Sequence, residues 1–297
     1  MKRRGNYKFL AKFSYYIPGV GGMFALLAWL LVGALLGSLV TIIIGAAVGP
    51  EFVTEYGVLI SYPVMFIPPM VFASAKSSAA SMDRRGRKLD STHFAPLGAA
   101  ACVLLALAGV FATGFWTDGI VSMLPEMPKA LKDALQQLTS GNFWLNFLTV
   151  SIFAPVFEEW LCRGMVLRGL LVKTKLNPIL AIVISAVFFA FIHMNPWQAI
   201  PAFLIGCLLG IVYYRTGSLK LTMLMHFANN TLSLILGHID SMKDMESWTD
   251  VMPVRNYAIV ASACFLLTVL VVMAFRKVKV QTPEGNFDEV PSIFEAE

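Results

Sequence analysis

The sequence predicts an all-α membrane protein with about eight transmembrane helices. Of its 297 residues, 57% are hydrophobic and only 14% are charged, whereas soluble domains usually carry about 25% charged residues. The apolar residues gather into long runs, and a run of about 20 is enough to cross a bilayer as a helix. Composition and patterning therefore favour a polytopic membrane protein, and the length fits one helical domain in the membrane.

Eight apolar runs are separated by short polar loops. The predicted spans are 19–47, 57–75, 97–117, 143–172, 178–195, 198–214, 218–238 and 257–275. The first follows Met1-Lys-Arg-Arg, which resembles the start of a signal peptide, but the run from Ile17 to Val48 is longer than the roughly 7–15 residues of a signal core. We expect it to be retained as the first helix. The segment from Ile120 to Leu138 is too polar to span, and we expect a short interfacial helix there.

Small residues at helical spacing predict close packing within two of these spans. Gly33 and Gly37 lie four apart in the first span, and Gly206 and Gly210 lie four apart in the sixth. Because glycine has no side chain, such a pair lets the backbone of a neighbouring helix approach closely. A structural role explains these glycines, and we assign them no chemistry.

Lysine and arginine are unevenly distributed over the predicted loops. If the N-terminus is inside, the outer segments hold Lys129, Lys132, Lys243 and Arg255, and Arg163 lies within the membrane. The rest of the 23 basic residues fall in the inner segments, as the positive-inside rule expects. The net charge of +5 thus reflects topology rather than a nucleic-acid surface. We expect both termini in the cytoplasm, and the short loops favour a bacterial plasma membrane.

Two adjacent glutamates, Glu158 and Glu159, lie inside the fourth predicted span. A charged side chain at the bilayer centre costs about 2.5–3.5 kcal/mol on insertion scales, so such residues usually have a partner or a function. On an α-helix Arg163 lies about 40° around the axis from Glu159 but about 140° from Glu158. We expect Glu159 to pair with Arg163 and Glu158 to be free for chemistry; one packing network of all three is the alternative.

Further polar residues occur in the fifth and seventh spans. The fifth ends with His193 and Asn195, and the seventh carries His226 and Asn230, which are four apart and project to one side. At about 1.5 Å per residue, Glu158 and His193 lie roughly 20 Å from the cytoplasmic end of their spans, and His226 lies roughly 12 Å from it. Helix tilt closes this difference, so we expect Glu158 and the two histidines to meet.

Such a group of residues suits hydrolysis of a peptide bond by an activated water. A glutamate in apolar surroundings can act as a general base, an imidazole can position the water, and a histidine with an asparagine can stabilise the oxyanion. Alternatively, Glu158, His193 and His226 can hold a divalent metal such as zinc with an open position. The HExxH helix of zinc peptidases is absent, and the residues alone leave both mechanisms open.

Three short motifs, in order and on separate predicted helices, resemble those of the CPBP family. That family, also called Abi, groups type II CAAX prenyl endopeptidases with bacteriocin-processing and immunity-type membrane proteins. The motifs are Glu158-Glu159-x-x-x-Arg163, Phe189-x-x-x-His193 and His226-x-x-x-Asn230. The resemblance implies a CAAX-prenyl-endopeptidase-like helical bundle. Its core is expected at 143–240, after three spans within 1–142 and before a last span and cytoplasmic tail within 241–297.

The resemblance also implies roles for the motif residues. Glu158 would activate the water, His193 would assist, and His226 with Asn230 would stabilise the oxyanion. The supporting residues would be Glu159, Arg163 and Phe189. The implied activity is an intramembrane endopeptidase, glutamate- or metal-dependent, acting on a peptide or a membrane-anchored protein.

Two other functions remain open from the sequence. The first is a non-catalytic membrane scaffold of the same family, such as a bacteriocin immunity protein or a partner of a sensor kinase. The second is a transporter, which the lack of repeated halves and of polar residues in the first three spans disfavours.

Overall fold

The computed structural model describes residues 8–81, 88–132, 141–174, 176–242, 245 and 247–280, and within these ranges the chain is helical without a strand. The shorter elements are α1 (Lys8–Ala11) and η4 (Trp248–Asp250). The long helices are α2 (Val20–Val48), α3 (Pro50–Ala80), α4 (Ala99–Val121), α9 (Pro178–Phe191), α10 (Pro196–Thr216), α11 (Leu219–Gly237) and α12 (Val254–Phe275). A further rod runs over Phe143–Val172.

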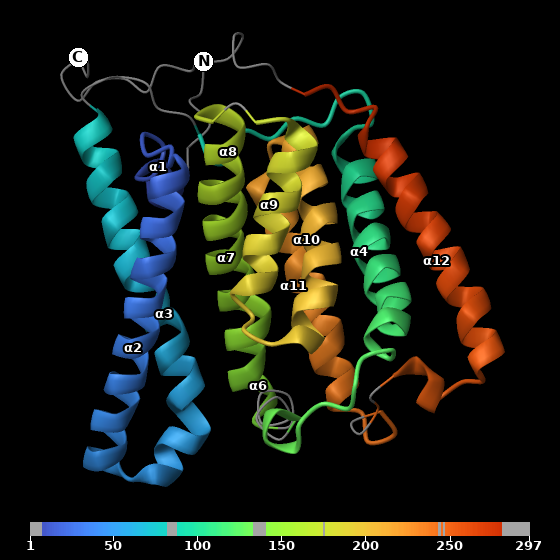
Figure 1. Ribbon diagram of the computed structural model, residues 1–297, viewed down its shortest axis with the longest axis horizontal. Coiled ribbons are helices and arrows are strands. Elements are labelled where there is room, and N and C mark those ends of the chain that lie inside the picture. The colour runs from blue at the N-terminus through green and yellow to red at the C-terminus, as the bar shows by residue number, and fades with distance from the viewer. Residues whose placement is uncertain are drawn as a thin grey trace.

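Figure 1 shows the helices side by side as a bundle, with the first described helix and the end of α12 at the same end. The hairpin of α2 and α3 stands along one side of the bundle, α4 and α12 stand along the other, and the rod with α9, α10 and α11 lies between them. The predicted all-α membrane fold is confirmed. Within the described ranges each of the predicted spans overlaps a helix.

Six of the described helices are long and apolar enough to cross a membrane by length and composition: α2, α3, α4, the rod Phe143–Val172, α10 and α12. Two predicted spans do not meet that measure. α9 has only 14 residues, and α11 contains Lys220, His226, Asn229 and Asn230, which lower its mean hydropathy. The protein is an integral membrane protein; by this measure its described residues contain six candidate spans, and the count of eight stays a prediction.

The fifth predicted span, 178–195, ends earlier than expected. α9 stops at Phe191, and residues 192–194 form a turn in which Met194 has φ 58°. Asn195 then caps α10, accepting a hydrogen bond from the backbone N–H of Gln198 at 2.8 Å. An asparagine before a proline is a strong helix start, so His193 and Asn195 lie in a turn and not on a helix face.

The interfacial helix expected between Ile120 and Leu138 is described only in part. Residues 120–121 complete α4, residues 129–132 are helical, and residues 133–140 lie outside the described part of the chain. The cytoplasmic tail expected after the last span lies mostly beyond residue 280 and thus also outside it.

Small residues permit the closest helix contacts in the bundle. A Cβ atom added to Gly33 would lie 2.0 Å from the backbone oxygen of Met65, and one added to Gly37 would lie 2.8 Å from that of Ser61. The two backbones of α2 and α3 therefore touch, as the glycine spacing predicts. This contact fixes the stretch of α3 between Ser61 and Met65, which carries Tyr62.

Replacement of Gly33 by valine is expected to destabilise the α2–α3 hairpin by about 1–3 kcal/mol, because the added atoms would overlap the backbone of α3. Thermal unfolding of the purified protein in detergent measures this effect. The matched control is Gly21→Val in the same helix, where nothing lies within 4 Å of an added Cβ. Equal midpoints for the two variants would contradict the close contact.

Candidate active site

The rod that carries the two glutamates is an α-helix interrupted by two π-helical segments. Asn142 caps its start, its side chain accepting from the backbone N–H of Trp144 at 3.0 Å. The α-helical piece α7 (Ala154–Glu159) lies between the π-helical segments η2 (Phe147–Phe153) and η3 (Trp160–Leu167). Short α-helical pieces α6 (Phe143–Asn146) and α8 (Arg168–Val172) form its two ends. π-Helical turns are rare and frequently mark functional sites.

Glu159 forms a fully buried ion pair with Arg163. Arg163 Nη1 donates to Glu159 Oε1 at 2.7 Å, and both side chains are 0% exposed. Arg163 Nη2 donates to the backbone oxygen of Gly206 at 2.9 Å, and the guanidinium lies 4.5 Å from the centroid of the Phe189 ring. The expected pairing of Glu159 with Arg163 is confirmed, and it joins the rod to α9 and α10.

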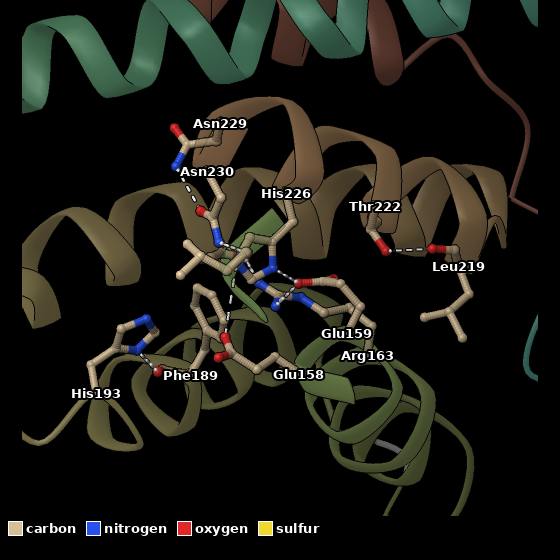
Figure 2. Close-up of polar contacts among 12 residues, drawn as sticks. Glu158, Glu159, Arg163, Phe189, His193, Leu219, Thr222, His226, Asn229 and Asn230 are labelled. Atoms are coloured by element: carbon tan, nitrogen blue, oxygen red, sulfur yellow. Dashed lines mark hydrogen bonds and ion pairs between the residues drawn. The ribbon is translucent and has the colours of Figure 1, made fainter. Parts of the chain in front are cut away.

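His226 on α11 makes its closest polar contact with Glu159 rather than with Glu158. Its Nδ1 lies 3.1 Å from Glu159 Oε1, and its Nε2 lies 3.9 Å from Glu158 Oε2 (Figure 2). A carboxylate ion-paired with Arg163 only accepts hydrogen bonds, so Nδ1 of His226 is protonated and donates to Glu159. Glu159 therefore orients the imidazole and directs Nε2 toward Glu158.

Glu158 is buried but differs from Glu159 in its partners. Its Oε1 accepts a hydrogen bond from the hydroxyl of Tyr62 on α3. Its Oε2 is buried and has no hydrogen-bond partner within the described residues. A buried oxygen without a partner is costly unless a water or a ligand satisfies it. Glu158 thus presents one oxygen, beside Nε2 of His226, to whatever enters the site.

Tyr62 is not among the site residues that the sequence predicts, because the first three predicted spans are taken as lacking polar residues. A tyrosine in an apolar run gives little signal, because its ring suits a lipid or core position equally well. Tyr62 lies 96 residues from Glu158 in the sequence, and no periodicity on one helix can reveal a contact with another. The hairpin α2–α3 therefore contributes directly to the site.

Phe189 is the common packing partner of the charged and imidazole groups. Its ring meets the ring of His226 edge-on at 5.4 Å and that of His193 at 5.0 Å, and it lies under the guanidinium of Arg163. His193 Nδ1 donates to the backbone oxygen of Phe189 at 2.8 Å, which leaves its Nε2 available. Phe189 therefore holds His193 beside the buried cluster.

Figure 2 shows how the predicted residues are distributed. Glu158, Glu159, Arg163 and His226 form one contact cluster, and His193 reaches it through Phe189. No hydrogen bond or ion pair joins His193 to Glu158 among the residues that the structure describes. The expected meeting of the three residues is therefore direct for Glu158 and His226 and indirect for His193.

Asn230 lies on the same face of α11 as His226 but is engaged with the rod. Its Nδ2 donates to the backbone oxygen of Val150 at 2.9 Å, and its Oδ1 accepts from Asn229 Nδ2 at 3.3 Å. Val150 lies in the π-helical segment η2, where the altered ladder makes its carbonyl available to a side chain. One amide N–H of Asn230 remains for a ligand.

A metal site is not formed by the predicted ligands in this arrangement. Among the described residues no group of three or more His, Cys, Asp or Glu side chains is placed to hold one ion. His226 directs Nδ1 to Glu159, and only its Nε2 faces Glu158. Nε2 of His226 and Oε2 of Glu158 face each other, whereas His193 bonds the backbone oxygen of Phe189, so the three predicted ligands do not surround one point and no step below passes through a metal.

One segment of the chain matches a known protein family, and it contains the buried glutamate pair, Arg163 and His226. Residues 140–232 match the family model Rce1-like, described as type II CAAX prenyl endopeptidase Rce1-like. The resemblance seen in the three motifs is thereby confirmed. The Rce1-like segment contains Glu158, Glu159, Arg163, Phe189, His193, His226 and Asn230, whereas Tyr62 lies outside it.

The chain is also similar to one curated protein over about a third of its length. A protein of Escherichia coli described as "Uncharacterized 24.3 kDa protein" is 31% identical over 96 residues, which is 31% of this chain and 44% of that protein. The chain thus matches less than half of the length of this relative. No solved structure matches the chain.

Proposed function

We propose that the protein is an intramembrane endopeptidase in which Glu158 activates a water molecule for attack on a peptide bond. The observation that carries the proposal is Glu158 Oε2, a buried carboxylate oxygen without a partner among the described residues that lies 3.9 Å from Nε2 of His226. The match of residues 140–232 to a family of endopeptidases supports it.

In the proposed reaction each residue has a separate task. Glu158 takes a proton from water, the resulting hydroxide attacks the carbonyl carbon, and Glu158 returns the proton to the leaving amine nitrogen. His226, held through Nδ1 by Glu159, faces the same space with Nε2. To stabilise the tetrahedral oxyanion, Nε2 must carry a proton as well, so in this role His226 acts as the imidazolium, which Glu159 has already oriented when charge develops.

The other side chains of the site position these groups. Tyr62 fixes Glu158 through Oε1, so that Oε2 remains directed toward the water. His193 and the free amide N–H of Asn230 are the remaining donors or acceptors available to the substrate. The proposed substrate is a peptide or a membrane-anchored protein.

Proteomics tests this function in cells. Cells that express the protein are compared with cells that express the Glu158→Gln variant at equal level, and peptides spanning candidate cleavage sites are quantified. We expect at least one membrane or secreted protein to accumulate as an uncleaved precursor in the variant. The proposal would be contradicted if precursor levels were the same with the unmodified protein and with the Glu158→Gln variant but differed in cells that lack the protein. That outcome would favour a non-catalytic scaffold.

Replacement of Tyr62 by phenylalanine is expected to lower kcat about ten- to hundredfold with little change in KM. A hydrogen bond to a charged group is worth about 1.5–3 kcal/mol, and each 1.36 kcal/mol changes the rate about tenfold. We expect KM to be preserved because the lost hydroxyl contacts Glu158 and is not proposed to bind the substrate. The ring that remains still packs against Phe66 at 5.5 Å.

Cleavage of an identified substrate by purified protein in detergent measures both constants for the Tyr62 variant. The matched control is Tyr56→Phe on the same helix, a ring stacked on Phe52 away from the site. If both variants kept the kcat of the unmodified protein, Tyr62 would have no positioning role.

A further inference from the structure

We propose that the candidate site opens at the end of the bundle opposite α1 and the end of α12, on the extracytoplasmic side, and that its substrate is a peptide segment presented on that side. This inference rests on the endopeptidase function proposed above, because it specifies from where that site is supplied. Three independent features of the bundle support it: the charge of its ends, the closure of one end and the exposed turn at the other.

One end of the bundle gathers the segments next to the termini and the basic loops. Hydrogen bonds hold these segments together: Arg168 Nη2 to the oxygen of Tyr16 at 2.5 Å, Ser91 N to that of Gly217 at 2.9 Å, and Lys279 N to that of Ala95 at 3.2 Å. The start of α2, the end of α8, the loops α3–α4 and α10–α11 and the end of α12 thus lie together (Figure 1).

Most described basic residues belong to this end. It carries Lys12, Lys76, Lys88, Lys173, Arg215, Lys220, Arg276, Lys277 and Lys279, whereas the segments at the opposite end carry Lys129, Lys132 and Arg255. Positively charged loops remain in the cytoplasm during insertion. The basic end is therefore the cytoplasmic end, and the opposite end faces the exterior.

Apolar side chains close the site toward the basic end. Leu89, Leu167 and Leu219 are each at most 1% exposed. A Cβ atom added to Gly164, one residue after Arg163, would lie 3.1 Å from Leu89 and 3.6 Å from Leu219. Since the polar cluster is capped in this way, a peptide cannot approach Glu158 from the cytoplasmic end without unpacking the core.

The opposite end carries the accessible polar groups. The turn after α9 holds His193 and Asn195, both partly exposed, and Met194, which is 75% exposed. Trp197 donates from Nε1 to the backbone oxygen of Pro125 at 2.9 Å, so the turn lies with the segment that follows α4. Backbone outside regular helices is tolerated at membrane depth only where protein or water satisfies it. The turn therefore borders the aqueous side from which substrate enters.

Access from the exterior selects a class of substrate. A peptide that reaches the site from the exterior belongs to a secreted protein or to the extracytoplasmic part of a membrane-anchored protein. The carboxyl-terminal tail of a cytoplasmic protein would have to enter through the closed basic end. The chemistry of cleavage is the same in both cases, and the side of access distinguishes them.

Single-cysteine labelling in intact cells tests this placement. A membrane-impermeant maleimide is applied to cells that carry Met194→Cys, Met123→Cys or Lys277→Cys, and the chain without added cysteine gives the background. Met123 is 83% exposed just after α4, at the same end as Met194, and Lys277 is exposed at the basic end. We expect Met194→Cys and Met123→Cys to be labelled in intact cells, and Lys277→Cys only after permeabilisation.

The control positions distinguish the orientation of the bundle in the membrane from the opening of the site at the turn. Labelling of Lys277→Cys but not of Met123→Cys in intact cells would overturn the orientation. Labelling of Met123→Cys without labelling of Met194→Cys would overturn the opening at the turn. The readout needs no proteolysis, so the same labelling in a Glu158→Gln background would leave this inference standing even if the endopeptidase function failed its own test.

Discussion

The Glu158→Gln variant is expected to lose cleavage by at least about a hundredfold, because general-base catalysis typically contributes 10²–10⁴-fold. Glutamine has the shape of glutamate but cannot take a proton from water. Its side-chain oxygen can still accept the hydrogen bond from Tyr62, so the bundle should fold and insert normally. Cleavage of an identified substrate by purified variant and unmodified protein in detergent measures the loss.

The control for Glu158 is Glu51→Gln, an exposed carboxylate in the first turn of α3. It should leave cleavage unchanged while removing the same charge. If Glu158→Gln retained full cleavage, Glu158 would not be the base. If instead the variant were inactive in vitro but restored a cellular phenotype, the scaffold function left open by the sequence would account for that phenotype.

The Glu159→Gln variant is expected to lose about 3–5 kcal/mol of stability, because removal of one partner strands Arg163 as an uncompensated buried charge. Both members of this pair are fully buried. Denaturant unfolding of the purified variant in detergent micelles measures the loss. Glu158→Gln is the matched comparison, since Glu158 has Tyr62 and His226 as neighbours but, among the described residues, no ion pair with an arginine or lysine.

The double variant Glu159→Gln with Arg163→Met should recover much of that loss, because replacing both charges removes the stranded one. Recovery of this kind is the signature of coupling between two groups. A double variant no more stable than Glu159→Gln alone would show that Arg163 matters through its bond to Gly206 and its contact with Phe189. Normal stability of the single variant would refute the structural role of Glu159.

The sequence predicts those features of the site that depend on one helix alone. The pairing of Glu159 with Arg163 follows from a separation of four residues, which places both on one face. The span ranges follow from apolar runs, and the glycine pairs follow from spacing. In each case the deciding residues lie within a few turns of each other, where backbone geometry fixes their relation.

Features that depend on two helices were not predictable in the same way. Helix geometry predicts that Glu158 and Glu159 have separate partners, but His226 lies close to both carboxylates. The sequence carries no sign of the π-helical segments on either side of α7, because widened turns arise from packing and not from local propensity. The end of α9 was misplaced because the run of apolar residues continues to Ile192, while the cap is set by Asn195.

The hydrogen bond between Tyr62 and Glu158 shows that the segment similar to the family is smaller than the set of residues that forms the candidate site. Every motif residue lies within 140–232, yet one contact to the proposed base comes from a helix that ends before that segment begins. A chain that keeps all three motifs but carries another first hairpin would retain the proposed catalytic groups and lose the contact that orients Glu158. Conversely, a chimaera that joins residues 140–232 to a different first hairpin should still match the family in sequence but should cleave its substrate more slowly.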